Sequence, residues 1–156
     1  MSEILIQYLL NAIFAAIPAL GFGMVFNVPR YTLIYCAIGG AITFSTRYIL
    51  MDFDIPIELA TFLASTTIGI IALYWSRKYK VPRPIYTIAS IIPLIPGTYA
   101  FTAMINLIDM NAHGVTPELI VMFVDNALKA IIILAGIGFG LALPSLYYIR
   151  YNRPIT

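Results

Sequence analysis

Long apolar runs without a charged side chain constrain this chain more than any other feature. Residues 4–26, 59–76 and 84–108 contain no Asp, Glu, Lys or Arg, residues 31–51 contain only Arg47, and residues 119–149 contain only Asp125 and Lys129. A helix needs about 20 apolar residues to cross the hydrocarbon core of a bilayer, and the alternation typical of membrane β-strands is missing. The sequence predicts an all-α integral membrane protein, with five transmembrane helices in a single domain over residues 1–156.

The composition excludes several classes of function. Hydrophobic residues make up 61% of the 156 residues and charged residues 10%, whereas a soluble domain carries roughly a quarter charged residues. A formal net charge of +2 provides no basic field that could hold nucleic acid. One Cys and one His cannot form an internal disulfide or a His/Cys metal cluster. The chain contains no His-Glu-x-x-His, Gly-x-Ser-x-Gly or P-loop motif, so we expect neither an enzyme nor a cofactor.

The charges between the spans predict an orientation. Five spans put the basic residues on one side of the membrane and the acidic residues on the other. The basic set is Arg30, Arg77, Lys78, Lys80, Arg83, Arg150 and Arg153, and the acidic set is Glu3, Asp52, Asp54, Glu58, Asp109 and Glu118. Because Lys and Arg are enriched in cytoplasmic loops, we expect a cytoplasmic C-terminus and an external N-terminus. The first apolar run is longer than the h-region of a signal peptide, so we expect it to remain in the membrane.

Aromatic residues support the same orientation. Tyr and Trp are enriched where membrane helices meet water. The basic side carries Tyr31, Tyr35, Tyr74, Trp75, Tyr79, Tyr86, Tyr147, Tyr148 and Tyr151. This distribution predicts an interfacial aromatic belt on the basic side.

Two prolines and a glycine interrupt the fourth predicted span near its middle. Pro93 and Pro96 each remove a backbone donor and clash with the preceding turn, and Gly97 permits conformations that other residues avoid. We expect two half-helices, the second beginning at Gly97, Thr98 and Tyr99. Its unpaired N–H groups and positive dipole end would face the bilayer centre, an arrangement suited to a carboxylate. Prolines in membrane helices can also produce a kink that packing alone fills.

The first predicted span has a weaker version of this pattern, with Pro18 followed by Gly21. One interpretation is a second break there, which with the first would outline a substrate site. A simple kink is the alternative interpretation.

Three charged residues fall inside the predicted spans, and such residues are candidates for function. Arg47 lies about one turn from the acidic end of its span, where it could reach water or act in the site. Asp125 and Lys129 are four residues apart in an over-long span. They could form a solvated ion pair at the outer interface or supply a charge to the site. The sequence leaves these alternatives open.

Uncharged polar residues and glycines in the spans have two interpretations as well. Asn106 and Asn126 could donate hydrogen bonds to a substrate or join helices to one another. Gly136 and Gly140 are separated by three residues in an apolar span, a spacing that favours close helix packing.

Three segments carry a resemblance to a known family. They are residues 16–29, with the sequence AIPALGFGMVFNVP, the tripeptide Trp75-Ser76-Arg77, and residues 92–97, with the sequence IPLIPG. The chain resembles the threonine/serine exporter family, specifically the small subunit of its split form, the type proposed to export succinate. The resemblance implies a bacterial inner-membrane transporter and a larger membrane subunit as partner, and leaves the substrate open between threonine or serine and succinate.

The expected function is therefore one component of a two-component exporter of a small carboxylate metabolite. Five spans cannot supply two matching inverted halves, and no internal repeat is visible, so a partner or self-association is expected. A scaffold that only stabilises a transporter and a channel are the alternatives. A scaffold has no need of unpaired N–H groups that face a cavity, and a channel would show conductance.

Overall fold

A computed structural model describes residues 2–151, which form helices joined by short connectors and contain no strand. The elements are α1 (Ser2–Val25), η1 (Arg30–Thr32), α2 (Leu33–Asp52), α3 (Ile57–Tyr79), α4 (Arg83–Ser90), η2 (Ile92–Leu94), α5 (Gly97–His113) and α6 (Pro117–Tyr151). Among the described residues, four helices are long and apolar enough to cross a membrane, and a bent pair would make a fifth span. The predicted all-α membrane architecture is confirmed.

The fourth span is broken where the sequence predicts it. Residues 83–94 and 97–113 meet at an angle of 55°. Ile95 between them is extended, with φ −60° and ψ 130°, and Pro96 has φ −79° and ψ 55°. Because Pro93 and Pro96 have no N–H to continue the helix, the chain ends one helix and starts another.

Of the two interpretations of Pro18 and Gly21, the second break is not found. Helix α1 runs without interruption from Ser2 to Val25 with Pro18 inside it. A single proline removes one hydrogen bond, to the carbonyl of Phe14, and the turns on either side remain intact. The local signal was too weak to end the helix.

Helices α3 and α6 pack closely through small residues. A Cβ atom on Gly136 would lie 3.4 Å from the Glu58 carbonyl oxygen, and one on Gly69 would lie 3.1 Å from Cγ of Pro144. Ser65 donates a hydrogen bond of 3.3 Å to the Gly136 carbonyl. The close-packing role predicted for Gly136 is confirmed, and the contact places the start of α3 beside Gly136.

Aromatic side chains from three helices form a cluster at the basic end. The Tyr35 ring lies 5.0 Å from the Trp75 ring, 5.1 Å from the Tyr79 ring and 5.8 Å from the Tyr86 ring, measured between centroids. The Arg77 guanidinium lies 4.5 Å from the centroid of the Tyr148 ring on α6. These contacts bring the basic ends of α2, α3, α4 and α6 to one level. Arg153 lies outside the described residues, as do the side chains of Glu3, Arg150 and Tyr151.

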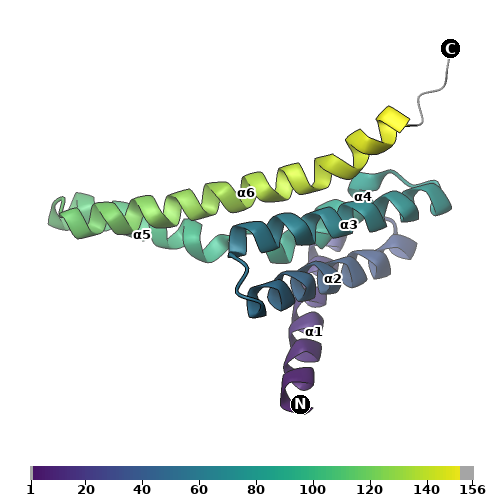
Figure 1. The fold of residues 1–156 in the computed structure, drawn as a ribbon, viewed down its shortest axis with the longest axis horizontal. Helices are drawn as coiled ribbons and strands as arrows, with labels where there is room; N and C mark the ends of the chain where they lie inside the picture. The colour runs from purple at the N-terminus through teal and green to yellow at the C-terminus, as the bar shows by residue number, and fades with distance from the viewer. Residues whose placement is uncertain (1, 152–156) are drawn as a thin grey trace.

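The core lies directly beside the break. Ala64 of α3, Leu94 of η2, and Ile133 and Ile137 of α6 form a buried cluster. From this core, α5 and the first half of α6 run side by side beyond the ends of α2 and α3, as Figure 1 shows. Helix α1 takes a different direction, and its N-terminal end lies away from the other helices (Figure 1).

Candidate functional site

Arg47 binds the first half of the broken span. Its Nη1 donates a hydrogen bond of 3.0 Å to the Leu94 carbonyl, and its Nη2 donates one of 3.0 Å to the Pro93 carbonyl. These carbonyls lie at the end of η2, where the helix stops and no following N–H can reach them. The guanidinium also lies 5.1 Å from the centroid of the Phe44 ring. Arg47 therefore caps the break from within the protein, a role that the sequence did not reveal.

The second half of the broken span starts without a cap. Its N-cap residue is Pro96, which has no side-chain acceptor, and no side-chain hydrogen bond is made there. The Gly97 N–H bonds the Ile95 carbonyl at 2.9 Å, and the Ala100 N–H bonds the Pro96 carbonyl at 3.1 Å. Within the described part of the chain, the N–H groups of Thr98 and Tyr99 have no acceptor. At the break, the carbonyl groups of Pro93 and Leu94 therefore accept hydrogen bonds from Arg47, whereas the N–H groups of Thr98 and Tyr99 have no acceptor in the described chain.

Gly97 does not have the backbone conformation that the sequence suggested. It is the first residue of α5, and among the described glycines positive φ is found at Gly114, with φ 92°. A Cβ atom on Gly97 would meet no atom within 4 Å. Gly97 and Thr98 are both exposed, so nothing within this chain requires glycine at the start of α5.

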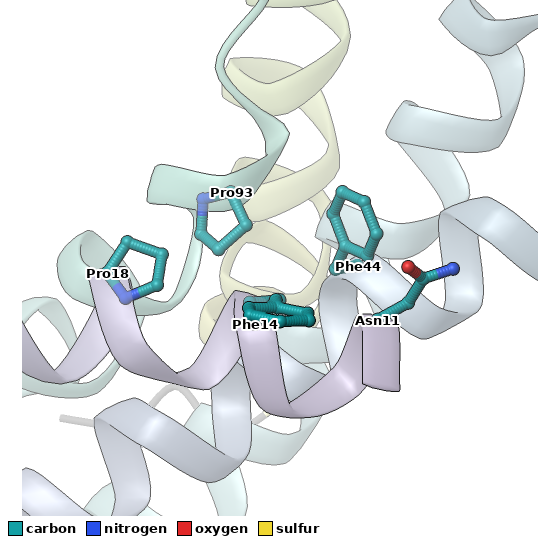
Figure 2. A pocket seen from close by; sticks show the side chains of 6 residues that line it. Asn11, Phe14, Pro18, Phe44 and Pro93 are labelled. Atoms are coloured by element: carbon teal, nitrogen blue, oxygen red, sulfur yellow. The ribbon is translucent and has the colours of Figure 1, made fainter. Parts of the chain in front are cut away.

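A pocket of about 240 Å³ lies against the break, between α1, α2 and η2. Figure 2 shows Pro18 and Phe14 of α1 and Phe44 of α2 around the same space as Pro93, with the Asn11 amide at its edge. Pro18 and Pro93 both line this pocket, and the sequence analysis assigned both to one candidate site. Sequence reasoning missed Asn11, although an amide in an uncharged span is a visible signal.

Polar side chains continue from the pocket along the contact between α1 and α2. Gln7 Nε2 donates a hydrogen bond of 2.9 Å to the Tyr48 hydroxyl. The Tyr8 hydroxyl donates to an Asp52 carboxylate oxygen, and the Tyr8 and Tyr48 rings meet edge to face at 5.7 Å. Sequence reasoning also missed these polar contacts between α1 and α2. The spacing of Gln7 and Asn11, four residues apart on one helical face, was the signal that could have found them.

Lys129 and Asp125 form an ion pair on α6 next to the first turn of α5. Their charged groups are 2.9 Å apart, and both side chains are partly exposed, at 39% for Lys129 and 57% for Asp125. The Lys129 ammonium lies 5.9 Å from the centroid of the Tyr99 ring. The pair is therefore near the start of α5, while Asn126 points back into its own helix and donates a 2.8 Å hydrogen bond to the Met122 carbonyl.

The remaining candidates lie away from the break. Asn106 is two and a half turns along α5, only 7% exposed, and its Nδ2 has no partner among the described residues. Gly21 lies on α1 one turn beyond Pro18, with open space around it. The structure therefore gathers Pro93, Pro96, Gly97, Thr98, Tyr99 and Arg47 at one place, with Pro18 across the pocket and Lys129 beside Tyr99.

Comparisons with known proteins agree with this architecture. Residues 11–147 match the family described as "Threonine/Serine exporter, ThrE". An uncharacterized protein of Haemophilus influenzae (strain ATCC 51907 / DSM 11121 / KW20 / Rd) is 40% identical over 152 residues, which are 97% of this chain and 51% of that protein. The chain thus spans about half the length of the curated relative it matches. No solved structure matches the chain.

The family match covers well over half of the chain, including α2 to α5 and most of α1 and α6. The apolar helices and the broken span are features of multi-pass membrane transporters. The chain therefore belongs to the threonine/serine exporter family, a family of membrane transporters.

Proposed function

We propose that this chain is one component of a two-component exporter of small carboxylate metabolites in a bacterial inner membrane. The substrate class is threonine and serine, or a dicarboxylate such as succinate. The N-terminus would be periplasmic and the C-terminus cytoplasmic, because the basic residues gather at the end of the helices that the positive-inside rule assigns to the cytoplasm.

The observation that carries the proposal is the asymmetry of the break. Arg47 satisfies the carbonyls of Pro93 and Leu94, while the N–H groups of Thr98 and Tyr99 have no acceptor in the described chain. An α-helix N-terminus carries roughly half a positive elementary charge and attracts anions. A carboxylate could accept hydrogen bonds from these two donors, which water or a ligand must otherwise satisfy.

The surroundings of the break suit a small substrate. The neighbouring pocket of about 240 Å³ is lined mainly by apolar side chains, with Asn11 as its polar residue. The charges of Arg47 and Lys129, both near the break, would add to the attraction for a carboxylate.

A second component is proposed on two grounds. The Haemophilus influenzae relative contains about as much sequence again beyond the matched segment. Transporters are commonly built from two related halves around a site at their interface. In this chain that second half would come from another polypeptide or from further sequence of the same protein.

The test is a matched pair of variants at Thr98, whose side chain is exposed. Thr98→Pro removes one of the two unpaired N–H groups, and proline is tolerated in the first turn of a helix because no intrahelical bond is lost. Gly97 before it lacks the Cβ that would clash with the proline ring. Thr98→Ala keeps the N–H and removes the hydroxyl.

Both variants are produced in cells that lack the native gene, and export of threonine, serine and succinate is measured at equal protein levels. We expect Thr98→Pro to lose most export and Thr98→Ala to keep it. Equal export by the two variants would refute binding at the start of α5. That result would favour the scaffold, which needs the chain to be present but needs no unpaired donor.

A further inference from the structure

Residues 101–113 of α5 and 117–128 of α6 form an antiparallel helical hairpin that we call the arm. Figure 1 shows the arm projecting past the ends of α2 and α3. Helix α5 packs against α6, and among the arm residues Ala103 and Asn106 are buried.

The arm lies beyond a helix that already has the length of a bilayer core. From Ile57 to Arg77, α3 measures about 30 Å at 1.5 Å per residue, which equals the hydrocarbon thickness. The start of α3 lies beside Gly136 of α6. From Gly136 back to Pro117, α6 continues for roughly 28 Å more.

Both outward faces of the arm are apolar. On α5, Phe101, Met104 and Ile108 lie opposite the side that packs on α6, and they are 66%, 61% and 59% exposed. On α6, Val121, Val124 and Leu128 lie opposite the buried Ile133 and Ile137 and are also exposed. Because these two faces are apolar and exposed, the arm needs a cover on two opposite sides.

Lipid alone is a poor cover for the arm. From Glu118 to Tyr148, α6 is about 45 Å long, and fitting this length into a 30 Å core needs a tilt of about 48°, beyond the usual range of membrane helices. The partly exposed Asp125–Lys129 ion pair would also enter hydrocarbon, where charges are costly. These two observations favour protein as the cover.

We propose that the arm docks into the second component of the exporter, whose apolar side chains cover both faces of the arm and whose polar groups face the Asp125–Lys129 ion pair. The inference rests on the two-component function proposed above. A two-fold contact between copies of this chain would cover one face of each arm and leave the other exposed. The relative from Haemophilus influenzae, with about as much sequence again beyond the matched segment, fits an enclosing partner better.

The test is cysteine labelling with a membrane-impermeant maleimide. In a Cys36→Ser background, single cysteines replace Leu107 or Val121, which are 53% and 67% exposed on the arm. His113→Cys, at the exposed tip, reports whether the arm faces the outside. Ile70→Cys, 58% exposed in the middle of α3, is the control for a lipid-facing position. Labelling is compared in cells with and without the longer membrane chain that export requires.

We expect positions 107 and 121 to react in the chain alone and to react at least tenfold more slowly when the second component is present. Position 113 should react in the absence of the partner, and position 70 in neither condition. No reaction at 107 and 121 in the chain alone would mean a lipid cover, and equal reaction in both conditions would mean no docking. When an oxidant replaces the maleimide, a disulfide-linked product of twice 17.3 kDa through position 107 or 121 would mean self-association. Each of these outcomes overturns the inference.

Failure of the inference can be told from failure of the proposed function. If export requires the second chain but labelling is the same with and without it, only the docking surface is wrong. If purified chain alone exports substrate from proteoliposomes, the two-component function itself is wrong.

Discussion

Replacing Arg47 by Leu should destabilise the break from inside the protein. The substitution removes two hydrogen bonds of 3.0 Å, to the carbonyls of Pro93 and Leu94, and the cation–π contact with Phe44. A hydrogen bond from an ionised donor contributes about 1.5–3 kcal/mol, and a buried acceptor left without a donor costs a similar amount. Because the site is half-buried and water can reach part of it, we expect Arg47→Leu to lower the free energy of unfolding by about 2–5 kcal/mol.

Two further variants sharpen this prediction. Arg47→Lys places a single ammonium where the planar guanidinium makes two hydrogen bonds. This variant should therefore recover part of the free energy of unfolding that Arg47→Leu loses. Lys129→Gln removes one positive charge from a partly exposed ion pair and should change stability by less than about 1 kcal/mol. Unfolding of the detergent-solubilised protein by a denaturing detergent gives the three free energies.

Export measurements distinguish whether Arg47 caps the end of η2 or binds the substrate. If Arg47 holds the break, Arg47→Leu should reduce export of threonine and succinate by the same factor, because both need the same half-helix. The reasoning is refuted if Arg47→Leu unfolds like the unaltered protein, or if succinate export falls while threonine export stays constant. The second result would mean that the guanidinium contacts the extra carboxylate of the dicarboxylate.

Three other predictions follow from particular positions. Gly97→Ala should change the free energy of unfolding by no more than about 1 kcal/mol, because the added Cβ meets no atom within 4 Å. A fall in export by this variant would therefore indicate that a substrate approaches Gly97 closely, and unchanged export would show that no ligand approaches there. Gly39→Ala should cost about 1–3 kcal/mol in the same unfolding assay, because its Cβ would overlap the Ser90 side chain; equal stability of the two alanine variants would contradict this. A reporter fused after Arg153 should be active only in its cytoplasmic form and one inserted at Asp54 only in its external form, and the opposite pattern would reverse the proposed orientation.

The sequence predicted the features that arise from local chemistry. Pro93 and Pro96 broke the fourth span near its middle, because proline lacks the donor that a continuous helix needs. Gly136 on α6 packs against α3 as its spacing indicated. At Pro18 the sequence left a break and a simple kink open, and the helix continues because one missing hydrogen bond is outweighed by the intact turns around it.

The sequence could not predict the contacts that depend on which helices are neighbours. Arg47 had an apparent route to water along its own helix, but the folded chain puts the carbonyls of η2 within its reach. Lys129 and Tyr99 are thirty positions apart and meet because α5 and α6 run antiparallel. The pocket between α1, α2 and η2 depends on the packing of three separate segments, so Asn11 could be noticed from the sequence but could not be placed.

Helix α5 connects the two proposals. Its first turn carries the unpaired N–H groups of Thr98 and Tyr99, and its remaining turns form half of the arm. Both hydrogen bonds of Arg47 go to residues before the 55° bend, so they fix η2 and do not fix the direction of α5. A second component docked on the arm would therefore help to set where the donors of α5 lie relative to Arg47. On this reasoning Thr98→Pro should remove most export while the arm cysteines remain protected, whereas loss of the second component should abolish both export and protection. If Thr98→Pro also exposed the arm, the substitution would have disrupted α5 as a whole, and the separation of site from docking surface would be wrong.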